Sequence, residues 1–196
     1  MKKIFGYFFI IIINYLLLSF LVFTFSYVSL INNKTYDLLW VEYIQKKLYF
    51  SGLRNLWNLD KNCSKFDENF LYAPVVGECN FSNPEFKTKL NFDENRRLNM
   101  VDDNIQEDEK IIAVLGDSVA MGWGVNDNET FSYNLQKLTN KKVINLAVSS
   151  YGTVREIKRL KLNKFYDQVD TVIIQYHLND IAENKNLNIN KTYTQK

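Results

Sequence analysis

Apolar residues form one long run at the start of the chain. No charged residue occurs from Ile4 to Asn33, and the apolar part of this segment covers the 28 positions to Ile31. At about 1.5 Å per residue, a helix of that length extends roughly 42 Å, which exceeds the roughly 30 Å hydrocarbon core of a bilayer. No small-residue cleavage site follows the run, as it would in a signal peptide. We therefore expect residues 1–33 to form an uncleaved single-pass transmembrane anchor.

Beyond residue 110, short apolar runs alternate with helical patterns. The pattern predicts strands over Ile111–Leu115, Val143–Leu146 and Thr171–Tyr176, with a helix over Thr130–Leu138 and a second helix from Thr153 onward. Strands that alternate with helices are typical of a parallel sheet. The fold class expected is therefore α/β, within a domain over residues 111–196.

The second helix is predicted in more detail. Thr153-Val154-Arg155-Glu156 has the form of a capping box, in which the threonine and the glutamate satisfy the first backbone N–H groups. The spacing then predicts an inward face that carries Val154, Ile157 and Leu160.

Residues 34–110 show a weaker pattern. Tyr36–Trp57 is rich in aromatic and basic residues and is predicted to be a helix near the membrane surface, although a stalk or a helix packed on the domain fits equally well. Residues 58–110 hold both prolines and no sustained period, so we expect an irregular lead-in.

Charge changes the picture only at the membrane. The 196 residues carry a net charge of +2, with acids and bases interspersed, which does not suggest a nucleic-acid partner. Lys2 and Lys3 precede the anchor, and the positive-inside rule then keeps the N-terminus in the cytoplasm. The rest of the chain is expected in the periplasm or outside the cell.

The chain has two cysteines, Cys63 and Cys79. A pair outside the cytoplasm is able to form a disulfide, and two unpaired thiols are the alternative. Two cysteines and one distant histidine lack the spacing of zinc ligands, so no metal is expected.

Polar groups follow the first and third predicted strands directly. Gly116-Asp117-Ser118 comes after Ile111–Leu115, and Asn179-Asp180 follows Thr171–Tyr176. A serine at a strand-to-helix turn can present its hydroxyl to a carbonyl carbon and its backbone N–H to the oxyanion that develops. Four of the seven glycines lie between residues 116 and 152, where the backbone must turn tightly.

The motifs together resemble a known family. The string from Gly116 to Val125, the second block from Asn145 to Thr153, and Asn179-Asp180 stand in the order found in the SGNH/GDSL hydrolases, over roughly residues 111–184. The resemblance implies a flavodoxin-like three-layer α/β/α fold that hydrolyses or transfers acyl groups without a cofactor.

The resemblance also assigns roles to residues. Ser118 would be the nucleophile, and the oxyanion would be held by the N–H of Ser118, a backbone N–H of the second block and the side-chain amide of Asn179. The second-block glycine of the family aligns with Ser150, and Gly152 follows two residues later, so both residues are candidates for the oxyanion hole. Two aspartates, Asp117 and Asp180, would have structural roles near the site.

One part of the family pattern is missing. No Asp-x-x-His occurs, and in the family this block would fall beyond Lys196, so we expect an incomplete sheet and an incomplete gene product. The one histidine, His177, shares a strand face with Asn179 and is a candidate substitute base. Its alternative role is to fill space at a strand end.

Three functions follow from these patterns. The first is a membrane-anchored serine esterase that acts through Ser118 on a lipid or an O-acylated saccharide. The second is an acyltransferase that modifies envelope polysaccharide beside a membrane partner. The third is a non-catalytic module, because the Asp-x-x-His block is absent.

Overall fold

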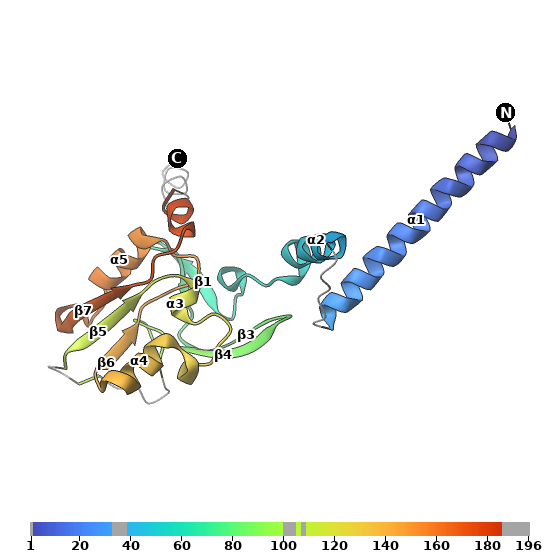
Figure 1. Cartoon of the computed structure of the whole chain (residues 1–196). Coiled ribbons are helices and arrows are strands. Elements are labelled where there is room, and N and C mark those ends of the chain that lie inside the picture. Colours follow the sequence, from blue (N-terminus) through green and yellow to red (C-terminus); the bar gives the residue numbers. More distant parts are fainter. Residues whose placement is uncertain (1, 33–38, 100–104, 107–108, 186–196) are drawn as a thin grey trace. The chain divides into compact units, whose positions relative to one another are not determined.

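The structure, a computed structural model, describes residues 2–32, 39–99, 105–106 and 109–185. It is a mixed α/β chain with small sheets and one long apolar helix at the N-terminus (Figure 1). The backbone contacts divide the chain into two units. Unit 1 comprises residues 1–55 and 83–86, and unit 2 comprises residues 56–82 and 87–196.

Unit 1 consists mainly of two helices. Helix α1 (Lys2–Ile31) contains the stretch Gly6–Leu30, which has a mean hydropathy of 2.5 and is long and apolar enough to cross a membrane. Helix α2 (Leu39–Leu48) continues into a π-helical turn over Tyr49–Leu53. The predicted N-terminal helix is confirmed, while its insertion and orientation stay predictions.

Two antiparallel hairpins replace the irregular lead-in that we expected. After a 3-10 turn at Trp57–Leu59, the first hairpin pairs β1 (Ser64–Asp67) with β2 (Leu71–Pro74), and the second pairs β3 (Gly77–Asn83) with β4 (Phe86–Phe92). Burial alternates along β3 and β4 as in a strand with one covered face. The buried positions include Asn83 and Thr88 as well as apolar residues, so the hydrophobic pattern alone does not reveal these strands.

A three-stranded parallel sheet forms the centre of unit 2. Strand β5 (Ile111–Leu115) lies between β6 (Lys142–Asn145) and β7 (Val169–Ile174), in the order β6-β5-β7. All five residues of β5 are buried. The three strands predicted from sequence are therefore confirmed, within one or two residues at each end.

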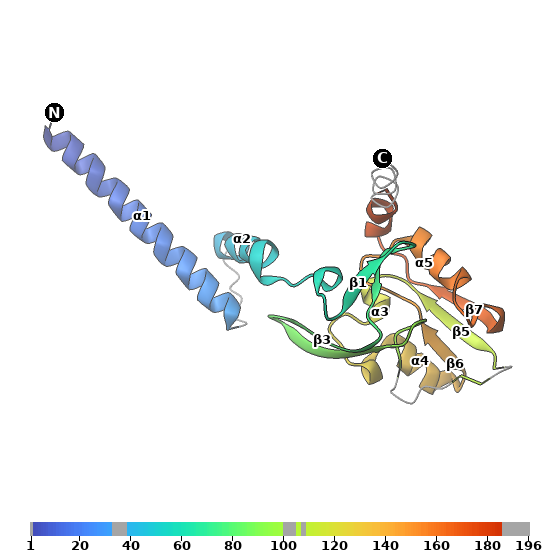
Figure 2. The same ribbon diagram turned by 180° about the vertical axis from the view of Figure 1, so that it is seen from behind.

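Helices lie on both faces of this sheet. Helix α4 (Phe131–Thr139) connects β5 to β6, and α5 (Thr153–Lys161) leads from β6 toward β7. The connection from β5 to β6 and the connection from β6 to β7 run in opposite directions across the sheet, and right-handed crossovers then place their helices on opposite faces. Figures 1 and 2 show α4 and α5 on opposite sides of the sheet. Short helical elements complete the unit: α3 (Ser118–Met121) and 3-10 turns at Asp127–Glu129 and Tyr166–Gln168.

The core beside α5 is small and apolar. Its buried members are Ile111, Ala113, Leu115, Ile144, Leu146 and Leu160, with Phe165 packed against them. Of the face predicted for α5, only Leu160 is buried. Val154 and Ile157 are exposed.

The helix predicted from Thr153 is confirmed, but the inward face predicted for it was wrong, because polar groups cover much of its buried face. Arg155 donates to the carbonyl of Phe70 at 3.4 Å, and Arg159 donates to the carbonyl of Asn95 at 3.2 Å. The capping box predicted to open at Thr153 is also absent. The N-cap is Gly152, which has no side chain to accept a hydrogen bond from a backbone N–H. Tertiary contacts with the preceding segment have overridden the local pattern.

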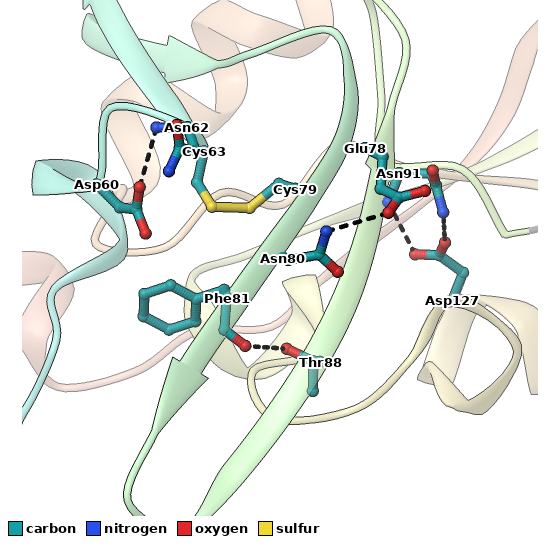
Figure 3. Close-up of a disulfide and its surroundings, with 10 residues drawn as sticks. All are labelled: Asp60, Asn62, Cys63, Glu78, Cys79, Asn80, Phe81, Thr88, Asn91 and Asp127. Atoms are coloured by element: carbon teal, nitrogen blue, oxygen red, sulfur yellow. Dashed lines mark hydrogen bonds between the residues drawn. A yellow bond between two sulfur atoms is a disulfide. The ribbon is translucent and has the colours of Figure 1, made fainter.

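A disulfide joins Cys63 to Cys79, with their Cα atoms 5.0 Å apart (Figure 3). Both residues are buried. The bond connects the residue before β1 to the third residue of β3, and it lies close to Phe81, whose carbonyl accepts from Thr88 Oγ1 at 3.4 Å. Of the two alternatives left open by the sequence, the structure has the disulfide.

We predict that replacing both cysteines, Cys63→Ser with Cys79→Ser, lowers the free energy of unfolding of unit 2 by about 3 kcal/mol, because the bond closes a loop of 16 residues in the unfolded chain. Urea denaturation measures the change. A reductant should destabilise the wild type by a similar amount and leave the double variant unaffected. Equal stability of oxidised and reduced wild type would contradict the prediction.

Candidate functional site

The turn after β5 requires a glycine. Gly116 has a φ of 152°, and a Cβ placed on it would lie 2.6 Å from the Cβ of Ala120 and 2.9 Å from Oε1 of Gln175. Asp117 then caps α3, because its Oδ1 accepts from the N–H of Val119 at 2.9 Å. The turn is thus held in one shape before the chain reaches Ser118.

Ser118 is the first residue of α3 and is partly exposed. Its carbonyl accepts from the N–H of Gly122 at 3.2 Å and from the N–H of Trp123 at 2.8 Å. Within the described part of the chain, neither its hydroxyl nor its backbone N–H has a hydrogen-bond partner. Both groups that the proposed chemistry needs are therefore available.

A buried arginine from the lead-in holds the loop after Ser118. The guanidinium of Arg97 donates to the carbonyls of Met121 at 2.5 Å, Gly122 at 3.0 Å and Val125 at 2.9 Å, and it pairs with Asp127 at 3.0 Å. Burial lowers the pKa of Arg97, and the charge of Asp127 opposes that shift. Sequence reasoning missed Arg97, because its segment shows no regular pattern.

Asp127 is itself held from a second side. Asn91 on β4 donates to its two carboxylate oxygens, through its backbone N–H at 3.2 Å and its side-chain amide at 2.6 Å (Figure 3). The loop after Ser118 therefore depends on side chains from β4 and from the segment that follows it.

The loop after β6 runs beside the serine turn. The N–H of Val148 donates to the carbonyl of Gly116 at 3.2 Å. Ser150 has a φ of 59°, in the left-handed region that favours glycine. This is the position where the family resemblance places a glycine, so Ser150 adopts a glycine-like backbone. Its N–H makes no hydrogen bond to the residues that the structure describes.

Gly152 has a different environment from Ser150. A Cβ on Gly152 would lie 2.5 Å from Oδ1 of Asn184 and 2.9 Å from the carbonyl oxygen of Asp180. The glycine therefore allows the loop after β6 to approach the segment after β7. Its position indicates a packing role as the N-cap of α5.

The segment after β7 carries Asn179 and His177. Pairing with β5 continues as far as Gln175, whose N–H donates to the carbonyl of Leu115 at 3.0 Å. Asn179 then begins a helical segment over residues 179–185. Nδ1 of His177 forms a hydrogen bond with Oδ1 of Asn179.

This pairing orients both side chains. Two groups of Asn179 meet Nδ1 of His177: the side-chain Oδ1, and the backbone N–H, which donates to it at 3.5 Å. The amide nitrogen of Asn179 keeps its two donors, which have no partner among the described residues. His177 is exposed, so it does not fill space at the strand end, and no described hydrogen bond connects it to Ser118.

Asp180 connects the segment after β7 to α5. Its side chain is fully buried, and its Oδ2 accepts from Thr153 Oγ1 at 2.7 Å. Its Oδ1 has no partner in the described structure, and neither carboxylate oxygen of Glu156, a residue that is 1% exposed, has one. Burial, together with the charges of Asp180 and Asp117, raises the pKa of Glu156 to about 8, against the opposing effect of Arg155.

The three loops converge at the carboxyl edge of the sheet. Gly116 bonds to the loop after β6 and packs against the segment after β7. Ser118, Ser150 and Asn179 therefore lie on adjoining segments, although no described hydrogen bond joins their side chains to one another. Groups of three or more residues able to hold a metal ion are absent from the described residues.

A hollow of about 440 Å³ lies elsewhere on unit 2. Its lining comes from the second hairpin and one further residue: Asn80, Phe81, Ser82, Lys87, Thr88, Lys89 and Asn126. Ser118 does not line it. This hollow therefore adds nothing to the candidate site.

Comparisons of this chain with protein-family models, curated proteins and solved structures find no match. Interpretation of the site accordingly depends on its own residues and geometry.

We predict that Glu156→Gln removes the loss of stability that unit 2 of the wild type undergoes as the pH rises from 5 to 9. The folded-state pKa of about 8 lies above the ordinary value of 4.5, so the wild type is fully stabilised below pH 4.5 and loses stability as pH rises through 8. The glutamine variant should be the more stable protein at pH 9. Thermal unfolding from pH 5 to pH 9 measures the difference, and Glu129→Gln, at an exposed position, is the control. Parallel profiles for wild type and Glu156→Gln would contradict the prediction.

Proposed function

We propose that this protein is a serine ester hydrolase of the SGNH type, with a flavodoxin-like α/β/α fold. The observation that carries the proposal is the position of Ser118 beside β5, where the strand order reverses. Crevices at the carboxyl ends of strands around such a reversal are where open α/β sheets bind their ligands. The order β6-β5-β7 is that of the first three strands of a flavodoxin-like sheet.

In the proposed reaction, Oγ of Ser118 attacks the ester carbonyl carbon and gives its proton to a base. The alcohol leaves with a proton, and water then hydrolyses the acyl-serine ester. The unbonded N–H groups of Ser118 and Ser150 and the amide of Asn179 are the proposed oxyanion donors. Each such donor is typically worth about 3 kcal/mol of the barrier.

His177 is the candidate for the base. The 196 residues contain no Asp-x-x-His, and His177 is the one histidine among them. An imidazole is the kind of group that takes a proton from a serine hydroxyl, and its bond to Asn179 keeps it on the same segment as a proposed oxyanion donor. No described hydrogen bond joins it to Ser118.

We place the substrate at a cell envelope. The apolar length of α1 supports an anchor, and the disulfide between Cys63 and Cys79 supports an oxidising compartment for unit 2. Together with Lys2 and Lys3 before the anchor, this favours a cytoplasmic N-terminus with unit 2 in the periplasm or outside the cell. The proposed substrate is the acyl ester of a lipid or of an O-acylated saccharide.

We predict that a fluorophosphonate probe labels the full chain at Ser118, because an activated serine attacks phosphorus as it attacks an ester carbonyl. Labelling should be lost in Ser118→Ala and kept in Ser51→Ala, which alters an exposed serine in unit 1. Peptide mapping of the labelled protein identifies the site.

Two outcomes of this test separate the alternatives. Loss of labelling in His177→Ala, with the fold intact by circular dichroism, would identify His177 as the base, and retained labelling would exclude it. A folded protein that is not labelled at Ser118 would contradict the proposal and favour the non-catalytic module.

A further inference from the structure

Helix α2 has one buried side and one exposed side. Gln45 is buried, while Tyr43, at 61% exposure, lies on the opposite side of the helix. Helices α1 and α2 are in contact, and the buried positions of α1 are Ser26 and Ser29, near its end. We infer from these burials that α2 packs against the last turns of α1 through the side that carries Gln45.

The exposed side combines aromatic rings with basic groups. It carries Tyr43, Lys46 and Lys47 on α2, and Phe50 in the π-helical turn and Arg54 at its C-cap continue it; we call these five residues the aromatic-basic stripe. Nζ of Lys47 lies 5.2 Å from the ring centre of Tyr43, and the guanidinium of Arg54 lies 5.5 Å from that of Phe50. Phe50 is 66% exposed. An exposed phenylalanine among cations is costly in water and favourable at a membrane interface.

The position of the stripe along α1 indicates its depth. Gly6–Leu30 has 25 residues, which extend roughly 37 Å at about 1.5 Å per residue, against a hydrocarbon core of roughly 30 Å. The last turns of α1 therefore lie in the headgroup region of a bilayer that the helix crosses. Because α2 packs beside those turns at Ser26 and Ser29, its outer side lies at the same depth.

Charge determines which lipids the stripe favours. Lys46 pairs with Glu42 at 2.7 Å, which balances one positive charge. Lys47 leaves the stripe positive, and basic residues beside a membrane attract anionic headgroups. Tyr43 and Phe50 supply the rings that settle at the depth of the headgroups.

We propose that the aromatic-basic stripe of α2 and the π-helical turn binds the surface of an anionic bilayer beside the end of α1. This inference depends on the proposed membrane anchor and is independent of the esterase proposal.

The test uses the full chain reconstituted in vesicles of phosphatidylcholine, with and without anionic phosphatidylglycerol. A spin label is attached to the new cysteine of Phe50→Cys, while Cys63 and Cys79 stay joined and do not react. Labels at Leu138→Cys, where the leucine is 86% exposed in unit 2, and at Leu17→Cys in α1 are the references for water and for lipid. Relaxation by a water-soluble nickel chelate and by oxygen reports the surroundings of each label.

We expect the label at position 50 to be severalfold less accessible to nickel than the label at position 138, and more accessible to oxygen. Phosphatidylglycerol should increase this protection. The double variant Lys46→Gln with Lys47→Gln should lose the increase, whereas Lys61→Gln with Lys65→Gln, at exposed positions of unit 2, should keep it.

Three results would overturn the inference, and they are distinguishable. Nickel accessibility at position 50 equal to that at position 138, with position 17 protected, would leave the anchor standing and remove the bound stripe. Nickel access at position 17 would remove the anchor and the stripe together. Protection at position 50 that does not respond to phosphatidylglycerol would also overturn the proposed anionic surface.

Discussion

The parallel pairing of β5 on both of its edges is the constraint on which the rest of unit 2 depends. Because the three strands run in one direction, the loops that follow them all emerge at the same edge. Because β6 and β7 lie on opposite sides of β5, the two crossover helices must cover opposite faces. One hydrogen-bonding pattern thus brings the segments of Ser118, Ser150 and Asn179 together and builds the layers that support them.

Strand pairing alone does not hold the loop after Ser118 in place at the carboxyl edge of the sheet. Arg97 reaches the loop after Ser118 from a segment that also bonds to the sheet, through its own N–H and the carbonyl of Asn145 at 2.9 Å. Burying a guanidinium costs several kcal/mol, and Asp127 with three carbonyls offsets that cost. A side chain of Gly122 would meet this guanidinium at 2.6 Å, so the glycine and the arginine depend on each other. The segment before β5 is therefore part of the site's support.

The sequence predicts what periodicity and local chemistry determine. The apolar run of β5, the turn at Gly116 and the cap at Asp117 each follow from neighbouring residues, and all three are present. The buried face of α5 was not predictable in this way, because carbonyls of distant segments bind Arg155 and Arg159. Two features of the site also depend on distant contacts, namely the role of Arg97 and the exposure of His177. The esterase chemistry itself stays a prediction that rests on motif and position.

The buried carboxylates explain how the segment of Asn179 is held on α5. Thr153 and Glu156 are one turn apart and share a face of α5, and Thr153 already donates to Asp180. Burial keeps Glu156 protonated at neutral pH, and a protonated carboxyl has a hydrogen to donate. The neighbouring group without a partner is Oδ1 of Asp180. A neutral acid beside one carboxylate avoids the repulsion of two buried charges. The hydroxyl of Thr153 therefore holds the residue after Asn179 on α5, and the protonated Glu156 adds no second negative charge beside it.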